Sequence, residues 1–152
     1  MKVEKSMTVA APIADVWEFL LDPKRMAASV PGTQSVEELS ATEYRAVVKV
    51  KISFISATFK VKTTITEQDA PRYLRCEGAG EDSKVASSMK HDSELFLAET
   101  DDGGTEIKVK ADAQVFGRLG SFGLSVMKTK IDRLWKEFGE NLRRELEVGA
   151  LS

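Results

Sequence analysis

Residues 111–148 read ADAQVFGRLGSFGLSVMKTKIDRLWKEFGENLRRELEV, and this stretch decides the fold. As far as Phe116, apolar and polar residues alternate, as in a strand with one buried face. From about Arg118 to Val148 the apolar residues recur every three or four positions, which predicts a long helix. Its apolar stripe consists of Leu119, Phe122, Val126, Met127, Ile131, Leu134, Trp135, Phe138, Leu142 and Leu146.

The alternation runs through most of the chain before this helix. It predicts strands over residues 3–10, 43–52, 57–66, 72–80, 87–99 and 105–116, with a further strand after Gln34. Two short helices follow the first strand, and Asp22-Pro23 is a start signal for the second of them. One packed and one polar face per strand is typical of an antiparallel sheet.

The predicted helix and the longest strands have matching lengths. A helix of about 28 residues and a strand of about twelve are both roughly 40 Å long. We therefore predict an α+β helix-grip fold in a single domain over residues 1–152, in which a curved antiparallel sheet wraps the final helix. Such a sheet leaves more internal volume than its own side chains fill, so we expect a lipophilic cavity.

Composition limits the classes of function. The chain has 152 residues, a net charge of -2 and a single cysteine, Cys76. The near-neutral charge argues against nucleic-acid binding, and one cysteine excludes an internal disulfide, which favours the cytoplasm. No stretch reaches the ~20 apolar residues of a membrane span. One histidine and one cysteine predict no zinc site, and the opening MKVEKSMTV does not resemble a signal peptide.

Four segments of the sequence carry a family resemblance. They are TVAAPIADVWEFLLDPKRM (8–26), SVPGTQSVEEL (29–39), VKVKISFISATFKVKTTI (48–65) and ADAQVFGRLGSFG (111–123). With the order of elements, they resemble the CoxG-like family of carbon monoxide dehydrogenase subunits, within the START-like, or SRPBCC, superfamily. The resemblance implies a non-catalytic accessory protein that binds a quinone in its cavity and needs no other cofactor. It also implies a partner, a molybdenum hydroxylase of the carbon monoxide dehydrogenase type, and peripheral contact with the inner membrane face.

The alternation and the helix stripe select the residues expected to line the cavity. The single histidine, His91, is either a polar handle for a ligand carbonyl, a general base, or a satisfied wall residue. Ser93 shares its face. The expected lining consists of Tyr44, Phe59, Val61, Thr63, Cys76, His91, Leu95, Leu97, Val109, Phe122, Val126, Leu134 and Phe138.

Three segments near the ends of the predicted strands have two interpretations each. Gly117, Gly120 and Gly123 form either a thin cavity mouth or a close contact between helix and sheet. Residues 78–88 form either a gate or a plain hairpin end. Phe54 and Ile55 at a predicted hairpin tip either contact a partner or a bilayer surface, or they fold back over the sheet or meet a crystal or dimer neighbour.

The pattern predicts no catalytic residues. Glu94 and Asp112 fall on the outward faces, and we find no carboxylate on the inward faces. A general acid or base needs a positioned group within hydrogen-bond reach of its substrate. Binding is therefore favoured over chemistry. Two alternatives stay open: a small enzyme of the polyketide cyclase or dehydratase kind that uses His91 with Tyr44 or Cys76, and a structural adaptor with a filled core.

Overall fold

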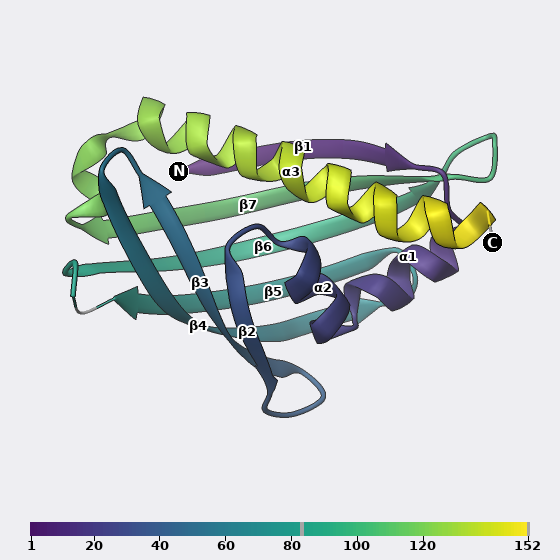
Figure 1. The fold of residues 1–152 in the computed structure, drawn as a ribbon. Helices are drawn as coiled ribbons and strands as arrows, with labels where there is room; N and C mark the ends of the chain where they lie inside the picture. The colour runs from purple at the N-terminus through teal and green to yellow at the C-terminus, as the bar shows by residue number, and fades with distance from the viewer. Residues whose placement is uncertain (83, 152) are drawn as a thin grey trace.

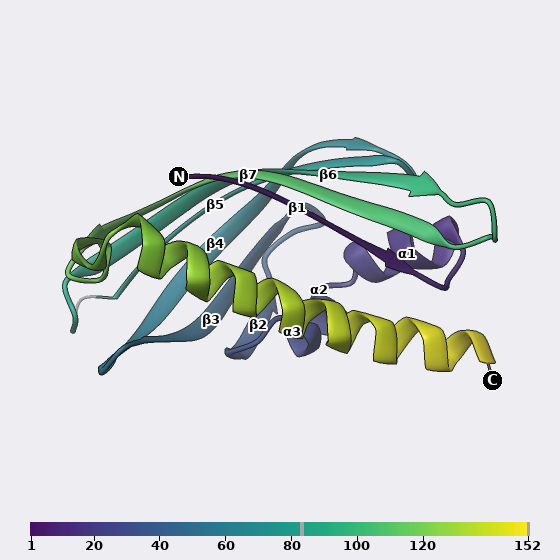
Figure 2. The ribbon, with the colours of Figure 1, turned by 90° about the horizontal axis from the view of Figure 1, so that it is seen from above.

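The computed structural model describes the backbone of residues 1–82 and 84–151, and the side chains of 1–82 and 84–147. Seven strands form one antiparallel sheet in the order β1-β7-β6-β5-β4-β3-β2. The sheet curves around the long helix α3, as Figures 1 and 2 show. The elements are β1 (Lys2–Val9), α1 (Ile13–Leu20), α2 (Pro23–Ser29), β2 (Thr33–Glu38), β3 (Glu43–Ile52), β4 (Ile55–Asp69), β5 (Tyr73–Asp82), β6 (Ser87–Glu99), β7 (Thr105–Gly117), the 3₁₀ turn η1 (Leu119–Phe122) and α3 (Leu124–Leu151).

The two short helices are held by local signals and by burial. The Asp22 side chain accepts hydrogen bonds from the backbone N–H groups of Lys24 and Arg25, and Pro23 occupies the first turn of α2. This is the N-cap that the sequence predicts. In α1, Val16 and Phe19 are fully buried. Because a helix of eight residues is marginal alone, packing against the sheet is what stabilises α1.

The inward side chains of the sheet form two separate apolar cores. The first core joins α1, the C-terminal half of α3 and one end of the sheet; it consists of Met7, Val9, Ala11, Val16, Phe19, Leu20, Leu97, Ile107, Leu142 and Leu146. The second core lies under the β3–β4 hairpin at the other end; it consists of Ile52, Ile55, Ala57, Phe59, Val61, Leu119 and Met127. The middle of the sheet belongs to neither core.

The long helix begins later than the sequence predicts. Gly123 has φ 89 and separates η1 from α3, so that α3 starts at Leu124 rather than near Arg118. Leu119 and Phe122 therefore lie on the 3₁₀ turn and not on the helix stripe. Val126 is also misplaced, since at about 100° per residue it falls well outside the Met127–Leu134–Phe138 stripe. Its side chain is 38% exposed, so Val126 does not line the interior.

Two hairpins decide between alternatives that the sequence leaves open. Residues 78–82 belong to β5 and 87–88 to β6, so of the two interpretations of residues 78–88 the strands favour the plain hairpin end. In the β3–β4 hairpin the loop contains only Ser53, with φ 56, and Phe54. Ile55 pairs with Ile52 and is buried, because both side chains then face the second core. Of the two alternatives for this tip, Ile55 therefore follows the one in which it folds back over the sheet, whereas Phe54 is 80% exposed.

Candidate functional site

Polar side chains cross the inner face of the sheet between the two cores. The register aligns Tyr44 with Thr63, Thr63 with Gly78, and Gly78 with His91. Cys76 and Ser93 pair with each other in the adjacent row. Because paired residues in an antiparallel sheet point to the same face, these side chains form one group. We call Tyr44, Thr63, Cys76, His91 and Ser93 the polar belt.

On β4 and β6 the polar belt lies between apolar residues; on β4, Thr63 has the buried Val61 on one side and the buried Ile65 on the other. On β6, Leu95 packs against the first core and Met89 against the second, with Ser93 and His91 between them. All five belt side chains are half-buried rather than buried, although they lie on the face that α3 covers. The five side chains therefore keep surface that the rest of the described chain does not cover.

His91 has the most defined geometry in the polar belt. Its Nδ1 and the Ser93 Oγ are 2.8 Å apart and share a hydrogen bond. The ring lies over Gly78, where an added Cβ would approach Nε2 to 2.3 Å. Burial lowers the pKa of His91, against a smaller opposite effect of Asp92. The ring is therefore neutral at pH 7, with one nitrogen as donor and the other as acceptor.

Tyr44 and Cys76 sit beside His91 in an environment that disfavours charge. Burial raises the pKa of the Cys76 thiol to about 11. Burial also raises the pKa of Tyr44, with smaller contributions from Cys76 and Glu38. Both groups stay protonated at neutral pH, so the belt offers uncharged donors and acceptors. Such a surface suits a ligand with polar but uncharged atoms.

The other residues expected to line the cavity divide into two groups. Phe59 and Val61 are buried in the second core, and Leu97 is buried in the first. These three side chains are walls with little free surface. Apart from the exposed Val126, the remaining expected residues are half-buried, and most of them pack against one of the cores: Leu95, Val109 and Phe138 against the first and Phe122 against the second, with Leu134 half-buried on α3.

The three glycines expected at the mouth differ from one another. A Cβ on Gly117 would lie 2.0 Å from the Ala86 carbonyl oxygen, and one on Gly120 would lie 2.4 Å from that of Val115. Both positions therefore require close backbone contact. At Gly123 an added Cβ would meet nothing within 4 Å, and its positive φ serves the break before α3. The geometry gives each glycine a packing or backbone reason for its presence.

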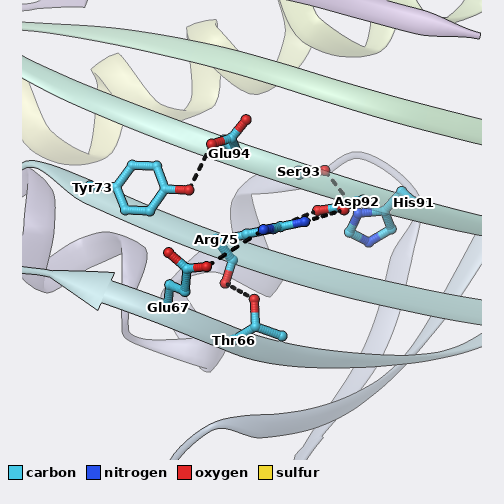
Figure 3. A network of polar contacts seen from close by, with 8 residues as sticks. All are labelled: Thr66, Glu67, Tyr73, Arg75, His91, Asp92, Ser93 and Glu94. Atoms are coloured by element: carbon cyan, nitrogen blue, oxygen red, sulfur yellow. Dashed lines mark hydrogen bonds and ion pairs between the residues drawn. The ribbon is translucent and has the colours of Figure 1, made fainter.

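The outer face behind the belt is tied together by charged side chains, shown in Figure 3. Arg75 donates to both carboxylate oxygens of Asp92, at 3.1 and 2.7 Å, and approaches Glu67 at 3.5 Å. Tyr73 donates to Glu94 at 2.7 Å, and this bond raises the pKa of Tyr73 to about 12. The Arg75 guanidinium in turn lowers the pKa of Asp92. The Asp92 carboxylate, next to His91 in sequence, therefore binds Arg75 on the opposite face of the sheet.

Two residues near the belt are not predicted by the sequence pattern. Glu38 at the end of β2 pairs with Tyr44 and so lies on the inner side of the sheet edge, where it is exposed. The expectation that no carboxylate lies on the inward faces is therefore wrong at this edge. The second residue that the pattern does not predict is Gly78, which leaves room for the His91 ring. A glycine inside a strand is a signal for such a close approach.

Two open depressions are lined mainly by outward residues. In the part of the chain that the structure describes, they have volumes of about 470 and 550 Å³ and are lined mainly by residues of β1 and β4–β7 such as Arg75, Asp92 and Lys110; the second also includes Gly78 and His91. Their charged lining and open shape do not suit a lipophilic ligand. The polar belt, with apolar walls on both sides, is the better candidate for a ligand-binding site.

Comparison with known proteins gives one family and many similar structures. Residues 6–147 match the model of the family described as the G subunit of carbon monoxide dehydrogenase (CoxG). No curated protein matches the chain. A conserved protein from Geobacillus kaustophilus has a TM-score of 0.89 at 18% identity, with 97% of this chain and 95% of that chain covered. A START superfamily protein from Mycobacterium smegmatis has a TM-score of 0.73 at 14% identity, with 96% and 97% covered.

An enzyme has the same fold. The Zhui aromatase/cyclase from Streptomyces sp. R1128 has a TM-score of 0.68 at 20% identity, with 97% of this chain and 93% of that chain covered. Identities this low establish a shared helix-grip, START-like fold and no shared activity. The predicted fold class is thereby confirmed.

Proposed function

The chain belongs to the CoxG family of carbon monoxide dehydrogenase subunits, and on that premise we propose that it is a non-catalytic accessory protein. It binds a lipophilic ligand, a quinone, in its interior and brings a molybdenum hydroxylase of the carbon monoxide dehydrogenase type to the membrane. The observation that carries the ligand proposal is the half-buried polar belt between two apolar cores. A quinone has matching parts, since its ring oxygens are polar and its isoprenoid tail is apolar.

The belt supports binding better than catalysis. His91 contacts Ser93, and no described carboxylate bonds to its ring. Asp92, its neighbour in sequence, binds Arg75 on the outer face. A histidine used as a general base normally needs a group that orients and stabilises its charged form. A neutral imidazole without such a carboxylate is suited to hydrogen bonding with a ligand.

Filling the interior beside the belt is expected to abolish ligand binding. Ala111 is half-buried and pairs with Ser93 on the inner face. We expect Ala111→Phe to weaken binding of a short-chain menaquinone analogue by at least ~10-fold, since the added ring occupies the ligand's space. Binding is followed by the fluorescence of Trp17 and Trp135, both of which pack against the first core, and by the shift in melting temperature.

The matched control is Gln114→Phe, which adds the same ring to the outer face of the same strand. We expect it to bind the analogue as the unchanged protein does. The ligand proposal fails if the unchanged protein shows no fluorescence or melting shift with the analogue. Equal binding by the Ala111→Phe variant places the ligand elsewhere.

One end of the molecule supports contact with a membrane surface. Residues 44–66, 83–91 and 113–131 contain ten Lys and Arg and no Asp or Glu, whereas the rest of the chain contains twelve Lys and Arg and all 24 Asp and Glu. The ends of these segments meet where the β3–β4 tip, the β5–β6 turn and the start of α3 lie, at the left of Figure 1. Arg45 and Lys62 lie away from this tip and pair with Glu37 and Glu43. Phe54, Phe116 and Leu124 are exposed at this end by 80, 50 and 65%.

Basic residues around exposed apolar side chains are the pattern of a protein that rests on anionic lipid. Among the described residues, no helix has the length and apolarity to cross a bilayer, so this proposal concerns surface contact. The Phe54 ring packs edge-on against Phe122, with centroids 6.4 Å apart. The exposed tip is therefore adjacent to the segment that leads into α3.

Removing the exposed apolar side chains is expected to weaken binding to anionic vesicles. We expect the double variant Phe54→Ser, Leu124→Ser to lower the partition coefficient on phosphatidylglycerol vesicles roughly 10-fold, which apolar burial of this size readily supplies. Binding of the unchanged protein should also fall as salt screens the basic residues. Leu39→Ser, which removes a side chain that is 37% exposed just after β2, is the control. Equal loss in both variants, or no binding at low salt, contradicts the proposal.

A further inference from the structure

We propose that His91 and Ser93 form a hydrogen-bonding anchor for a ligand oxygen, and that the pair accepts either the carbonyl or the hydroxyl form of that oxygen by changing tautomer. The inference rests on the proposed ligand site and adds to it the group that holds the ligand's head. It applies to ligands that interconvert between a ketone and a phenol, as a quinone and its quinol do.

The free nitrogen of the ring carries the first step. Nδ1 is bonded to Ser93 Oγ at 2.8 Å, whereas Nε2 has no hydrogen bond to any described residue. The described part of the chain contains no fully buried side-chain nitrogen or oxygen without a hydrogen-bond partner. Because Nε2 lacks a partner, it is not fully buried. It therefore keeps accessible surface, and a ligand atom can reach it.

Gly78 determines where Nε2 lies. The ring rests over this glycine, and even a methyl group at that position would come within 2.3 Å of Nε2. In the same row across the sheet, Gly78 pairs with Thr63 on β4, and Thr63 pairs with Tyr44 on β3. Nε2 thus extends from β6 over β5, toward the other polar groups of the belt. A ligand oxygen that binds there lies midway between the two apolar cores.

The chemistry of the pair permits two arrangements with the same heavy-atom positions. When the Ser93 hydroxyl donates to Nδ1, Nε2 carries the proton and donates to a carbonyl oxygen. When Nδ1–H donates to Ser93 Oγ, Nε2 is bare and accepts from a ligand hydroxyl. A serine hydroxyl can take either role, unlike a carboxylate or a backbone carbonyl. No proton is gained or lost by the protein, since the two arrangements are tautomers of one neutral ring.

Burial supports the neutral ring that both arrangements need, because it lowers the pKa of His91. The charged form would carry a proton on both nitrogens and could only donate. Asp92, the one acid adjacent in sequence, is held by Arg75 on the outer face. Ser93 is then the only described partner of Nδ1.

The first test compares affinities for the two redox forms of one ligand. Menadione and menadiol, kept reduced under anaerobic conditions, are titrated against the unchanged protein, and we expect dissociation constants within about 3-fold of each other. In Ser93→Ala, Nδ1 loses its partner, and a bare acceptor is tolerated better than an unpaired N–H. Nε2 then stays protonated, so we expect the affinity ratio to move toward menadione by roughly 10-fold. Ser93→Thr keeps the hydroxyl and should restore the original ratio.

The second test reads the ring directly. His91 is the only histidine, so ¹⁵N spectra of labelled protein report its tautomer without overlap. We expect Nε2–H with menadione and Nδ1–H with menadiol. An unchanged affinity ratio in Ser93→Ala, or one tautomer with both ligands, overturns the anchor while the ligand site stands. If the unchanged protein binds neither ligand, the anchor and the proposed function both fail.

Discussion

Replacing Phe19 by alanine is expected to lower the free energy of unfolding by about 3–5 kcal/mol, the usual range for a phenylalanine removed from a packed core. Phe19 is 0% exposed at the centre of the first core. The Arg25 guanidinium lies over its ring at 4.7 Å from the centroid. The substitution therefore removes part of the contact between α1 and the first core, to which Val16 and Leu20 also contribute, and part of the support of α2. Urea unfolding followed by circular dichroism measures the change.

The control for this prediction is another phenylalanine with the opposite environment. Phe54 is 80% exposed, so Phe54→Ala should change the free energy of unfolding by no more than about 0.5 kcal/mol. A loss below about 1 kcal/mol for Phe19→Ala would show that the first core is not packed as described. In that case the first core could not serve as the apolar wall on one side of the polar belt.

The thiol of Cys76 is expected to react at least about 10-fold more slowly in the folded protein than in the protein unfolded in urea. Burial raises its pKa from 9.0 to about 11, which lowers the thiolate fraction at pH 8 about 100-fold. The greater nucleophilicity of a more basic thiolate offsets roughly one factor of ten. Because Cys76 is the only cysteine, a disulfide reagent such as Ellman's reagent measures this rate directly.

The same measurement probes the proposed ligand site. Cys76 pairs with Ser93 in the polar belt, so a bound quinone analogue should slow the reaction further. Equal rates in the folded and unfolded protein would mean that the thiol lies in water and that the belt is not an interior surface. A slow rate that the analogue leaves unchanged would place the ligand away from Cys76.

Much of the fold follows from local patterns in the sequence. The two-residue alternation assigns the inward and outward faces of each strand, and the pattern of residues 126–146 indicates one face of a long helix. Asp22 and Pro23 mark the start of α2 because their side chains act on the nearest backbone groups. These features depend on residues a few positions apart. The order of elements and the inward position of all five belt residues could therefore be predicted.

Deviations from the local patterns occur where a single residue alters the backbone. Gly123, with φ 89, ends η1 and delays the start of α3, which removes Phe122 from the helix. The two-residue turn at Ser53 and Phe54 directs Ile55 inward. A periodic pattern averages over such positions, so the sequence suggests the helix and the hairpin but not their end points.

The sequence by itself determined which residues of most strands face inward, because alternation is a property of one strand. Only the tertiary structure decided which of them meet. Tyr44, Thr63, Gly78 and His91 come from four strands, and they form one row because the pairing of β3 to β6 sets their register. A slip of one residue in any pair would change every neighbour and move the paired side chains to the opposite face. The contact of the His91 ring with Gly78 and the position of Glu38 beside Tyr44 depend on that register, which is fixed by the packing of the whole sheet around α3.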